Sequence, residues 1–92
     1  MALSPSSVLK LNSDIRQTRV ENEGVILRQN DGEILVVNDV AIHFLELLDG
    51  DTTIETAANV LLKEYEVEPD ILVSDLLAYA EELIEETVLV EA

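Results

Sequence analysis

The sequence has little of several residue types that usually carry chemistry or stabilise a small fold. Its 92 residues include no cysteine, no tryptophan and only 3% aromatic residues. Without cysteine the chain can form neither disulfides nor a thiolate metal site. No stretch approaches the roughly 18 apolar residues of a membrane span, and the N-terminus lacks the features of a signal peptide. We therefore predict one small cytoplasmic domain, residues 1–92, with a core of Leu, Val, Ile and Ala.

Positive charge is scarce as well, above all in the C-terminal part of the chain. The net charge is −15, and the segment Glu64–Ala92 holds ten acids and no base. A field of that sign repels phosphate, so we expect no nucleic acid and no membrane among the partners. The carboxylates either form a solvated helix face that keeps the protein soluble or speed its encounter with a basic partner.

Groups suited to catalysis are missing from the pattern. His43 is the only histidine, and no obvious acid–base partner lies near it in the sequence. No serine has a histidine at the spacing of a nucleophile motif, and neither metal-ligand spacing nor a glycine-rich phosphate loop occurs. The sequence thus predicts a binding protein without a metal or cofactor, and not an enzyme.

Strand-forming segments fill the first part of the chain, after residues 1–7, whose turn-forming composition predicts a loose arm. The candidate strands are residues 8–12, 15–20, 25–29 and 33–37. Asn30-Asp31-Gly32 is a hairpin signal between the last two, because Asp and Gly tolerate positive φ. The prediction is an antiparallel meander of three or four strands.

The last of these strands is too apolar for a sheet with one solvated face. Ile34–Val37 is a run of four consecutive apolar residues, whereas a half-buried strand alternates. Such a strand needs cover on both faces. We expect Leu35 and Val37 to face the core. Ile34 and Val36 would then meet a bound peptide.

Helix signals follow directly after this strand. Asn38 is placed to cap the first helix, because its side chain can accept from backbone N–H groups two or three residues on. Asp49-Gly50 is expected to end that helix. Thr52 and Glu55 have the spacing of a capping box for the second helix.

The third helix is predicted over residues 69–86, with Pro69 at its first position, where a missing N–H costs nothing. Its apolar residues span an arc of about 160°, wider than an ordinary core-facing stripe. They are Leu72, Val73, Leu76, Leu77, Tyr79, Ala80, Leu83 and Ile84. The apolar tail at residues 88–90 is expected to fold back onto the domain.

Strands followed by three helices predict an α+β fold, with the helices packed on one face of a three-stranded antiparallel sheet. Two helices joined by the short link Asp49–Thr52, then a third, give a winged helix-turn-helix layout. Such a domain usually reads DNA through basic residues of its recognition helix, but the helix expected here carries acids and no Lys or Arg. Capture of a peptide as an added strand is the remaining binding mode.

One combination of features spans nearly the whole chain. It comprises the turn Asp31-Gly32, the join Val37-Asn38, the helix run Ala41–Leu48, the stretch Leu47–Glu55 with Ala57-Ala58, the stretch Glu64–Pro69, and the segments Asp75–Tyr79 and Leu83-Ile84. In this order and spacing, over residues 15–90, they resemble the PqqD-like family, also called RiPP recognition elements. The family often has a glycine near position 87, where this chain has Thr87, which leaves the path of the C-terminal tail open.

The resemblance implies three strands and three helices that bind the leader segments of ribosomally made, post-translationally modified peptides. In the family the leader adds as a strand to the third strand and lies in a cleft beside the third helix. Asp75 and Glu82 would attract basic leader residues. Transferred to this chain, the peptide-binding residues would be Glu33, Ile34, Leu35, Val36, Val37, Leu72, Asp75, Leu76, Tyr79 and Leu83.

The implied partners are the leader region of a precursor peptide and a separate processing enzyme. Length and acidity resemble the stand-alone leader-binding proteins of lasso peptide systems, in which that enzyme is a leader protease, followed by a cyclase. A PqqD-type chaperone of another modified-peptide pathway is one alternative. A structural or assembly subunit that pairs through the same apolar strand edge is a second, and a degenerate transcription factor is a third.

Overall fold

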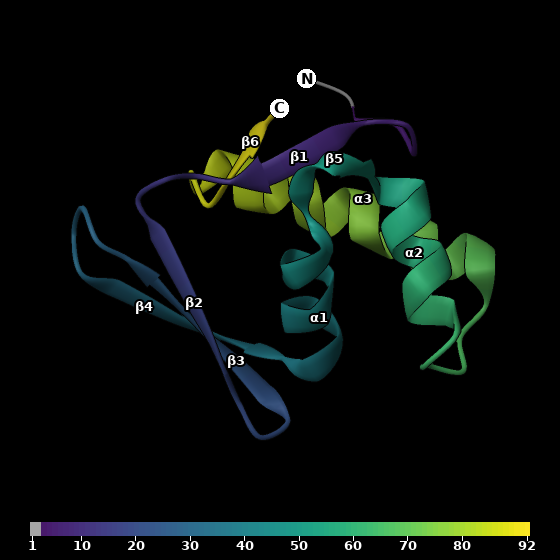
Figure 1. The fold of residues 1–92 in the computed structure, drawn as a ribbon, viewed down its shortest axis with the longest axis horizontal. Helices are drawn as coiled ribbons and strands as arrows, with labels where there is room; N and C mark the ends of the chain where they lie inside the picture. The colour runs from purple at the N-terminus through teal and green to yellow at the C-terminus, as the bar shows by residue number, and fades with distance from the viewer. Residues whose placement is uncertain (1–2) are drawn as a thin grey trace.

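A computed structural model, which describes residues 3–92, shows two small sheets and three helices (Figure 1). The elements are β1 Val8–Leu11, β2 Ile15–Val20, β3 Glu23–Arg28, β4 Glu33–Asn38, α1 Asp39–Leu47, β5 Asp49–Thr53, α2 Ile54–Leu62, α3 Pro69–Glu85 and β6 Leu89–Glu91. The predicted α+β class is confirmed, as is the order of a three-stranded meander followed by three helices. Met1 and Ala2 lie outside the described residues.

Strands β2, β3 and β4 form the predicted antiparallel meander, with β3 in the middle. Their register sets Ile26 opposite Leu35, and Val25 opposite Val36. Ile26 is fully buried, whereas Val36 is 64% exposed. Because side chains alternate across a strand, this sheet turns one face to the core and α1, and leaves the other face open (Figure 1).

A second sheet, which the sequence did not predict, has the order β5-β1-β6. β1 pairs antiparallel with both neighbours, so residues 8–11 do not extend the meander as expected. No local signal marks this sheet, because its three strands are far apart in the chain and β5 is the polar stretch Asp49–Thr53. The C-terminal tail does fold back as predicted, since Val88 and Leu89 are buried in the core.

Helix α1 starts at the residue after β4 ends, with no linker. Asn38 caps it as predicted: its side-chain oxygen accepts the N–H of Ala41 at 2.8 Å. The helix ends at Leu47. Asp49-Gly50 follows as the start of β5 and not as a plain helix-ending turn, with Gly50 at a φ of +89°.

The predicted capping box of α2 is wrong by one residue. Thr53, not Thr52, is the N-cap, and its hydroxyl oxygen accepts the N–H of Thr56 at 3.1 Å. Thr52 belongs to β5 instead, and its N–H donates to the carboxylate of Asp49 at 3.0 Å. Pairing with β1 therefore shifts the start of the helix away from the sequence signal.

Helix α3 begins at Pro69, as predicted, and ends in a Schellman motif. The N–H of Val88 donates to the carbonyl of Leu83 at 2.9 Å, and the N–H of Thr87 donates to that of Ile84 at 3.0 Å. Thr87 has a φ of +61°, in the left-handed region that favours glycine. The threonine thus takes a glycine-type conformation and turns the tail into β6.

The N-terminal segment is not a loose arm over residues 3–7. The carbonyl of Pro5 accepts the N–H of Glu55 at 2.8 Å, and that of Ser7 accepts the N–H of Ile54 at 3.1 Å. These donors are among the first N–H groups of α2, which have no partner within a helix. The segment is tied down because it completes the hydrogen bonding of the α2 N-terminus.

The core joins the helices to both sheets. Gly24 of β3 shows how closely α1 lies on the meander: a Cβ added there would be 2.4 Å from the Cβ of Ile42. Only glycine fits this contact. None of the helices within residues 3–92 combines the length and the apolar character that crossing a bilayer requires.

Candidate functional site

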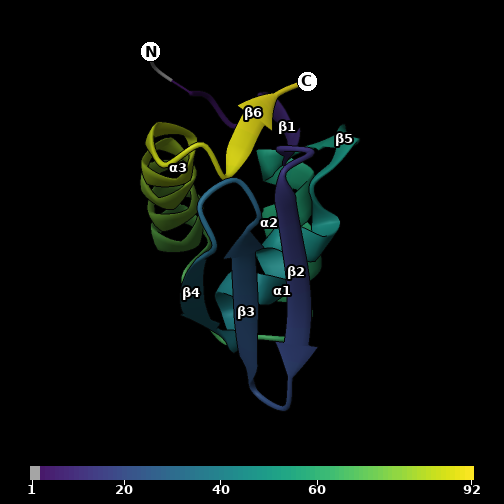
Figure 2. The same ribbon diagram turned by 90° about the vertical axis from the view of Figure 1, so that its left-hand side faces the viewer.

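Strand β4 is an edge of the meander and has no strand partner on its outer side. Every second residue of such a strand directs its N–H and C=O groups outward. The other edges are less suited to accept a strand, since β2 carries Arg16 and Arg19, β5 is the aspartate-containing stretch Asp49–Thr53, and β6 is short. Figure 2 shows β4 at the margin of its sheet, on the same side as α3.

A groove opens where β4 passes into α1 and faces α3, and we name it the β4–α3 groove. Its volume is about 330 Å³. Its walls are mostly apolar, with a few polar side chains. The lining residues are Asn38, Val40, Ala41, Val67, Leu72, Asp75, Leu76 and Tyr79.

Four residues that the sequence placed in the site do come together in this groove: Leu72, Asp75, Leu76 and Tyr79. Leu83 does not. It is 3% exposed, belongs to the core cluster and is absent from the groove lining. It lies toward the end of α3 where β6 packs against the helix, so its side of the helix is already covered.

The predicted orientation of β4 holds for the core side. Leu35 and Val37 pack against the core, whereas Ile34 and Val36 are 61% and 64% exposed. The expectation that Ile34 and Val36 meet the peptide stays a prediction. They point to the open face of the sheet, away from α1, and neither belongs to the groove lining.

Four lining residues were missed in the sequence: Asn38, Val40, Ala41 and Val67. The first three sit at the join of β4 and α1, where the cap at Asn38 already marks a chain reversal next to the strand edge. Val67 is a 45% exposed apolar residue in the acidic link between α2 and α3. The sequence feature that could have predicted its role is an apolar side chain between two acids in a short link.

Comparison with known proteins agrees with this architecture. The family model for coenzyme PQQ synthesis protein D (PqqD) matches residues 23–89. This chain belongs to the PqqD family. The family resemblance seen in the sequence is thereby confirmed.

Two solved structures are similar to this PqqD-family chain. "Lasso peptide synthetase B1 complexed with the leader peptide" has 26% identity and a TM-score of 0.78, over 89% of this chain and 96% of that one. "TbiB1 in complex with the TbiA(beta) leader peptide" has 20% identity and a TM-score of 0.78, over 87% of this chain and 93% of that one, and shows the shared fold. No curated protein matches the sequence significantly.

Tyr79 gives the groove of this PqqD-family chain an unusual polar atom. Its hydroxyl oxygen is buried and has no hydrogen-bond partner within residues 3–92. Burial raises the pKa of Tyr79, and the charges of Glu82 and Glu86 raise it further. The hydroxyl therefore keeps its proton at neutral pH and can both donate and accept. A buried polar group left unpaired is costly, and a visiting polar group would relieve that cost.

A polar cluster fixes α1 next to the groove. Arg19 of β2 forms ion pairs with Asp39 and, at 2.7 Å, with Glu46. The hydroxyl of Tyr65 donates to the second carboxylate oxygen of Asp39 at 2.6 Å. The hydrogen bond from Tyr65, and after it the one from Arg19, lower the pKa of Asp39. The same Tyr65–Asp39 hydrogen bond raises the pKa of Tyr65 to about 12. The first turn of α1 is thus held to the meander and to the end of α2.

His43, the only histidine, belongs to the same region. Its Nδ1 lies 3.0 Å from a carboxylate oxygen of Glu64, and its ring stacks edge-on to Tyr65 with centroids 6.1 Å apart. These contacts suit a structural role. Within the part of the chain that the structure describes, no group of three or more His, Cys, Asp or Glu side chains is arranged to hold a metal.

Proposed function

We propose that this chain binds the leader segment of a ribosomally made precursor peptide. The leader adds as an antiparallel or parallel strand to β4 and fills the β4–α3 groove with its inward side chains. The observation that carries the proposal is the coincidence of an unpaired, apolar strand edge with a groove at its end. The similar structures of a lasso peptide synthetase B1 and of TbiB1, each in complex with a leader peptide, support it.

Strand addition suits β4 for a physical reason. The added backbone would pair the outward N–H and C=O groups of Glu33–Val37, a mode that supplies affinity through main-chain hydrogen bonds. Alternate side chains of the guest would point to the groove, and the others to the open face beside Ile34 and Val36. Sequence preference then comes from the inward side chains, because these meet the groove.

The groove offers an anchor for one apolar or aromatic leader side chain. Burying roughly 100 Å² of apolar surface against Val67, Leu72 and Leu76 would contribute about 2–3 kcal/mol. Asp75 is exposed at the rim and would attract a basic leader residue, which adds a smaller and salt-sensitive contribution. The polar lining of Asn38, Asp75 and Tyr79 is suited to hydrogen bonding.

In this proposal the chain is a non-catalytic recognition element that presents the leader to a separate enzyme. A lasso peptide system, with a leader protease and a cyclase, is the pathway that we favour, because one of the similar structures is a lasso peptide synthetase B1 in complex with the leader peptide. We place the function in the cytoplasm, because a chain without cysteine has no disulfide that the reducing conditions there would break.

A titration of a fluorescein-labelled leader peptide, from the precursor encoded beside the chain, tests the proposal by fluorescence anisotropy. We expect a Kd in the micromolar range or below. Val67→Asp should weaken binding about tenfold, because it places a charge in the groove. Val20→Asp is the matched control, since Val20 is 51% exposed, lies on β2 and does not line the groove. Millimolar affinity, or equal affinity of the two variants, would contradict the proposal.

An assembly role is the second candidate, and the open face of the meander favours it. Val20, Ile34 and Val36 are all more than half exposed on that sheet. Such a face and edge could pair with another subunit, although a net charge of −15 opposes pairing with a second copy. Light scattering decides: a monomer that binds leader supports recognition, whereas a stable dimer that binds none supports assembly.

A further inference from the structure

Helix α3 has apolar side chains that lie outside the β4–α3 groove and that the core covers only in part. The core takes the middle of its wide apolar arc, which holds Leu72, Leu76, Ala80 and Leu83. Tyr79 and Asp75 flank that middle on the side of the β4–α3 groove. Val73 and Leu77 flank it on the opposite side and are only partly buried. The wide arc therefore serves two flanks of one helix.

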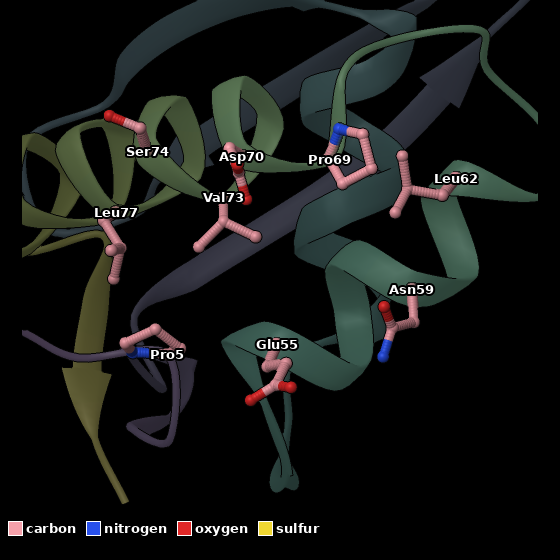
Figure 3. A pocket seen from close by; sticks show the side chains of 9 residues that line it. All are labelled: Pro5, Glu55, Asn59, Leu62, Pro69, Asp70, Val73, Ser74 and Leu77. Atoms are coloured by element: carbon pink, nitrogen blue, oxygen red, sulfur yellow. The ribbon is translucent and has the colours of Figure 1, made fainter.

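On this opposite flank lies a second groove, which we name the α2–α3 groove (Figure 3). Its volume is about 500 Å³. Figure 3 shows Val73 and Leu77 on the α3 wall, Leu62 on the α2 wall and Pro5 closing one side. The full lining is Pro5, Glu55, Asn59, Leu62, Pro69, Asp70, Val73, Ser74 and Leu77.

The charge of the α2–α3 groove has one sign. Glu55 and Asp70 are exposed carboxylates from α2 and α3, and the lining contains no basic residue. Neither carboxylate takes part in an ion pair among residues 3–92, whereas Arg19 and Arg28 pair with other acids. The groove thus has partly buried apolar side chains between two unpaired carboxylates. Such a surface is complementary to a peptide segment that carries an apolar side chain flanked by basic residues.

The charge also excludes several occupants. A second copy of the chain carries −15 and would be repelled, and phosphate-rich partners are disfavoured for the same reason. We propose that the α2–α3 groove docks a basic, amphipathic segment of the processing enzyme. An apolar side chain of that segment would lie on Val73 and Leu77, and its Lys or Arg residues would face Glu55 and Asp70.

This inference rests on the proposed leader binding and adds a place for the enzyme. Because the two grooves lie on opposite flanks of α3, a leader in one leaves the other free. The chain would then hold the leader and the enzyme at the same time, and α3 would contact both. Such double attachment raises the effective concentration of the leader at the enzyme without any new contact between the two.

The test uses the full chain labelled with ¹⁵N and a short synthetic helical peptide of Leu, Lys and Ala as the probe. We expect saturable shifts of the amides of Asn59, Val73, Ser74 and Leu77, both with and without leader peptide bound. The same peptide with Glu in place of Lys should produce none. Shifts spread over all acidic surfaces, without saturation, would overturn the proposal.

Two charge-matched double variants make the test specific. Glu55→Lys with Asp70→Lys should weaken the probe about tenfold at low salt. Glu85→Lys with Glu91→Lys changes the net charge equally, outside the groove, and should leave more of the affinity. Equal losses in both would mean non-specific attraction and would refute the site. Val73→Thr, which keeps the shape, should weaken the probe severalfold through the lost apolar contact.

A second readout connects the groove to processing. With the leader protease of the same system, Glu55→Lys/Asp70→Lys should slow leader cleavage about tenfold at low salt while leader affinity stays unchanged. An unchanged cleavage rate would refute docking at this groove. If the unmodified chain did not bind the leader, the proposed function itself would be refuted. The two failures are therefore distinguishable.

Discussion

Replacing Tyr79 by phenylalanine separates the stability of the free protein from its affinity for a leader. The substitution keeps the ring that lines the β4–α3 groove and removes only the hydroxyl. That hydroxyl oxygen is buried without a hydrogen-bond partner among the described residues. The same change should therefore help the free protein and harm the complex.

The size of both effects follows from the cost of an unpaired polar group. Burying a hydroxyl without a partner costs about 1–3 kcal/mol, so Tyr79→Phe should raise the free energy of unfolding by about 1 kcal/mol. In the complex that we propose, a backbone N–H or C=O group of the leader strand pairs with this hydroxyl. Losing this hydrogen bond should weaken leader binding about tenfold.

Urea denaturation of the free protein and anisotropy titration of a labelled leader measure the two quantities separately. Tyr79→Ala is the companion variant, since it removes the ring as well and should weaken binding further. A Tyr79→Phe protein that is less stable, yet binds leader as tightly as the unmodified chain, would refute the reasoning. It would mean that the hydroxyl already has a partner in the free state and none in the complex.

Three further predictions concern the fold itself. Gly24→Ala should lower the free energy of unfolding by about 3 kcal/mol in urea denaturation, because the added Cβ would lie 2.4 Å from that of Ile42. A loss below measurement error would contradict that packing. Thr87→Gly should raise the free energy of unfolding by about 1 kcal/mol, since its φ of +61° suits glycine; a less stable variant would refute this. Asp39→Asn should destabilise the protein at neutral pH. The hydrogen bond from Tyr65 lowers the pKa of Asp39 from 3.8 in the folded protein. The Asp39 carboxylate therefore stabilises the fold fully above its pKa in the unfolded chain, and this stabilisation is lost as the pH falls through its pKa in the folded protein. The deficit should begin to shrink as the pH falls below about 4 and should vanish only below the lower pKa of the folded state. A constant deficit across the acid range would count against this account.

Sequence patterns predicted those parts of the fold that local chemistry determines. The meander follows from strand-forming segments and the Asp31-Gly32 turn, and α1 starts where the Asn38 cap predicts. Each of these features depends on residues close together in the chain, where turn and capping preferences act directly. Leu35 and Val37 do face the core as expected, but the apolar run Ile34–Val37 does not itself distinguish the two faces of the strand.

The features that were missed depend on contacts between distant segments. β5 has no apolar alternation and becomes a strand only because β1 lies beside it. Leu83 could not be separated from Leu76 by helical periodicity, because both share the inner arc and only the position of β6 distinguishes them. The groove lining at Val67 likewise required the path of the link between α2 and α3.

Amide hydrogen–deuterium exchange with and without the leader peptide tests strand addition to β4 most directly. If the leader pairs with this edge, alternate amides within Glu33–Val37 should exchange more slowly in the complex, since their outward N–H groups gain partners. Amides of β2, at the opposite edge of the same sheet, should be unchanged and serve as the control. Protection at β2, β5 or β6 with none at β4 would contradict the account.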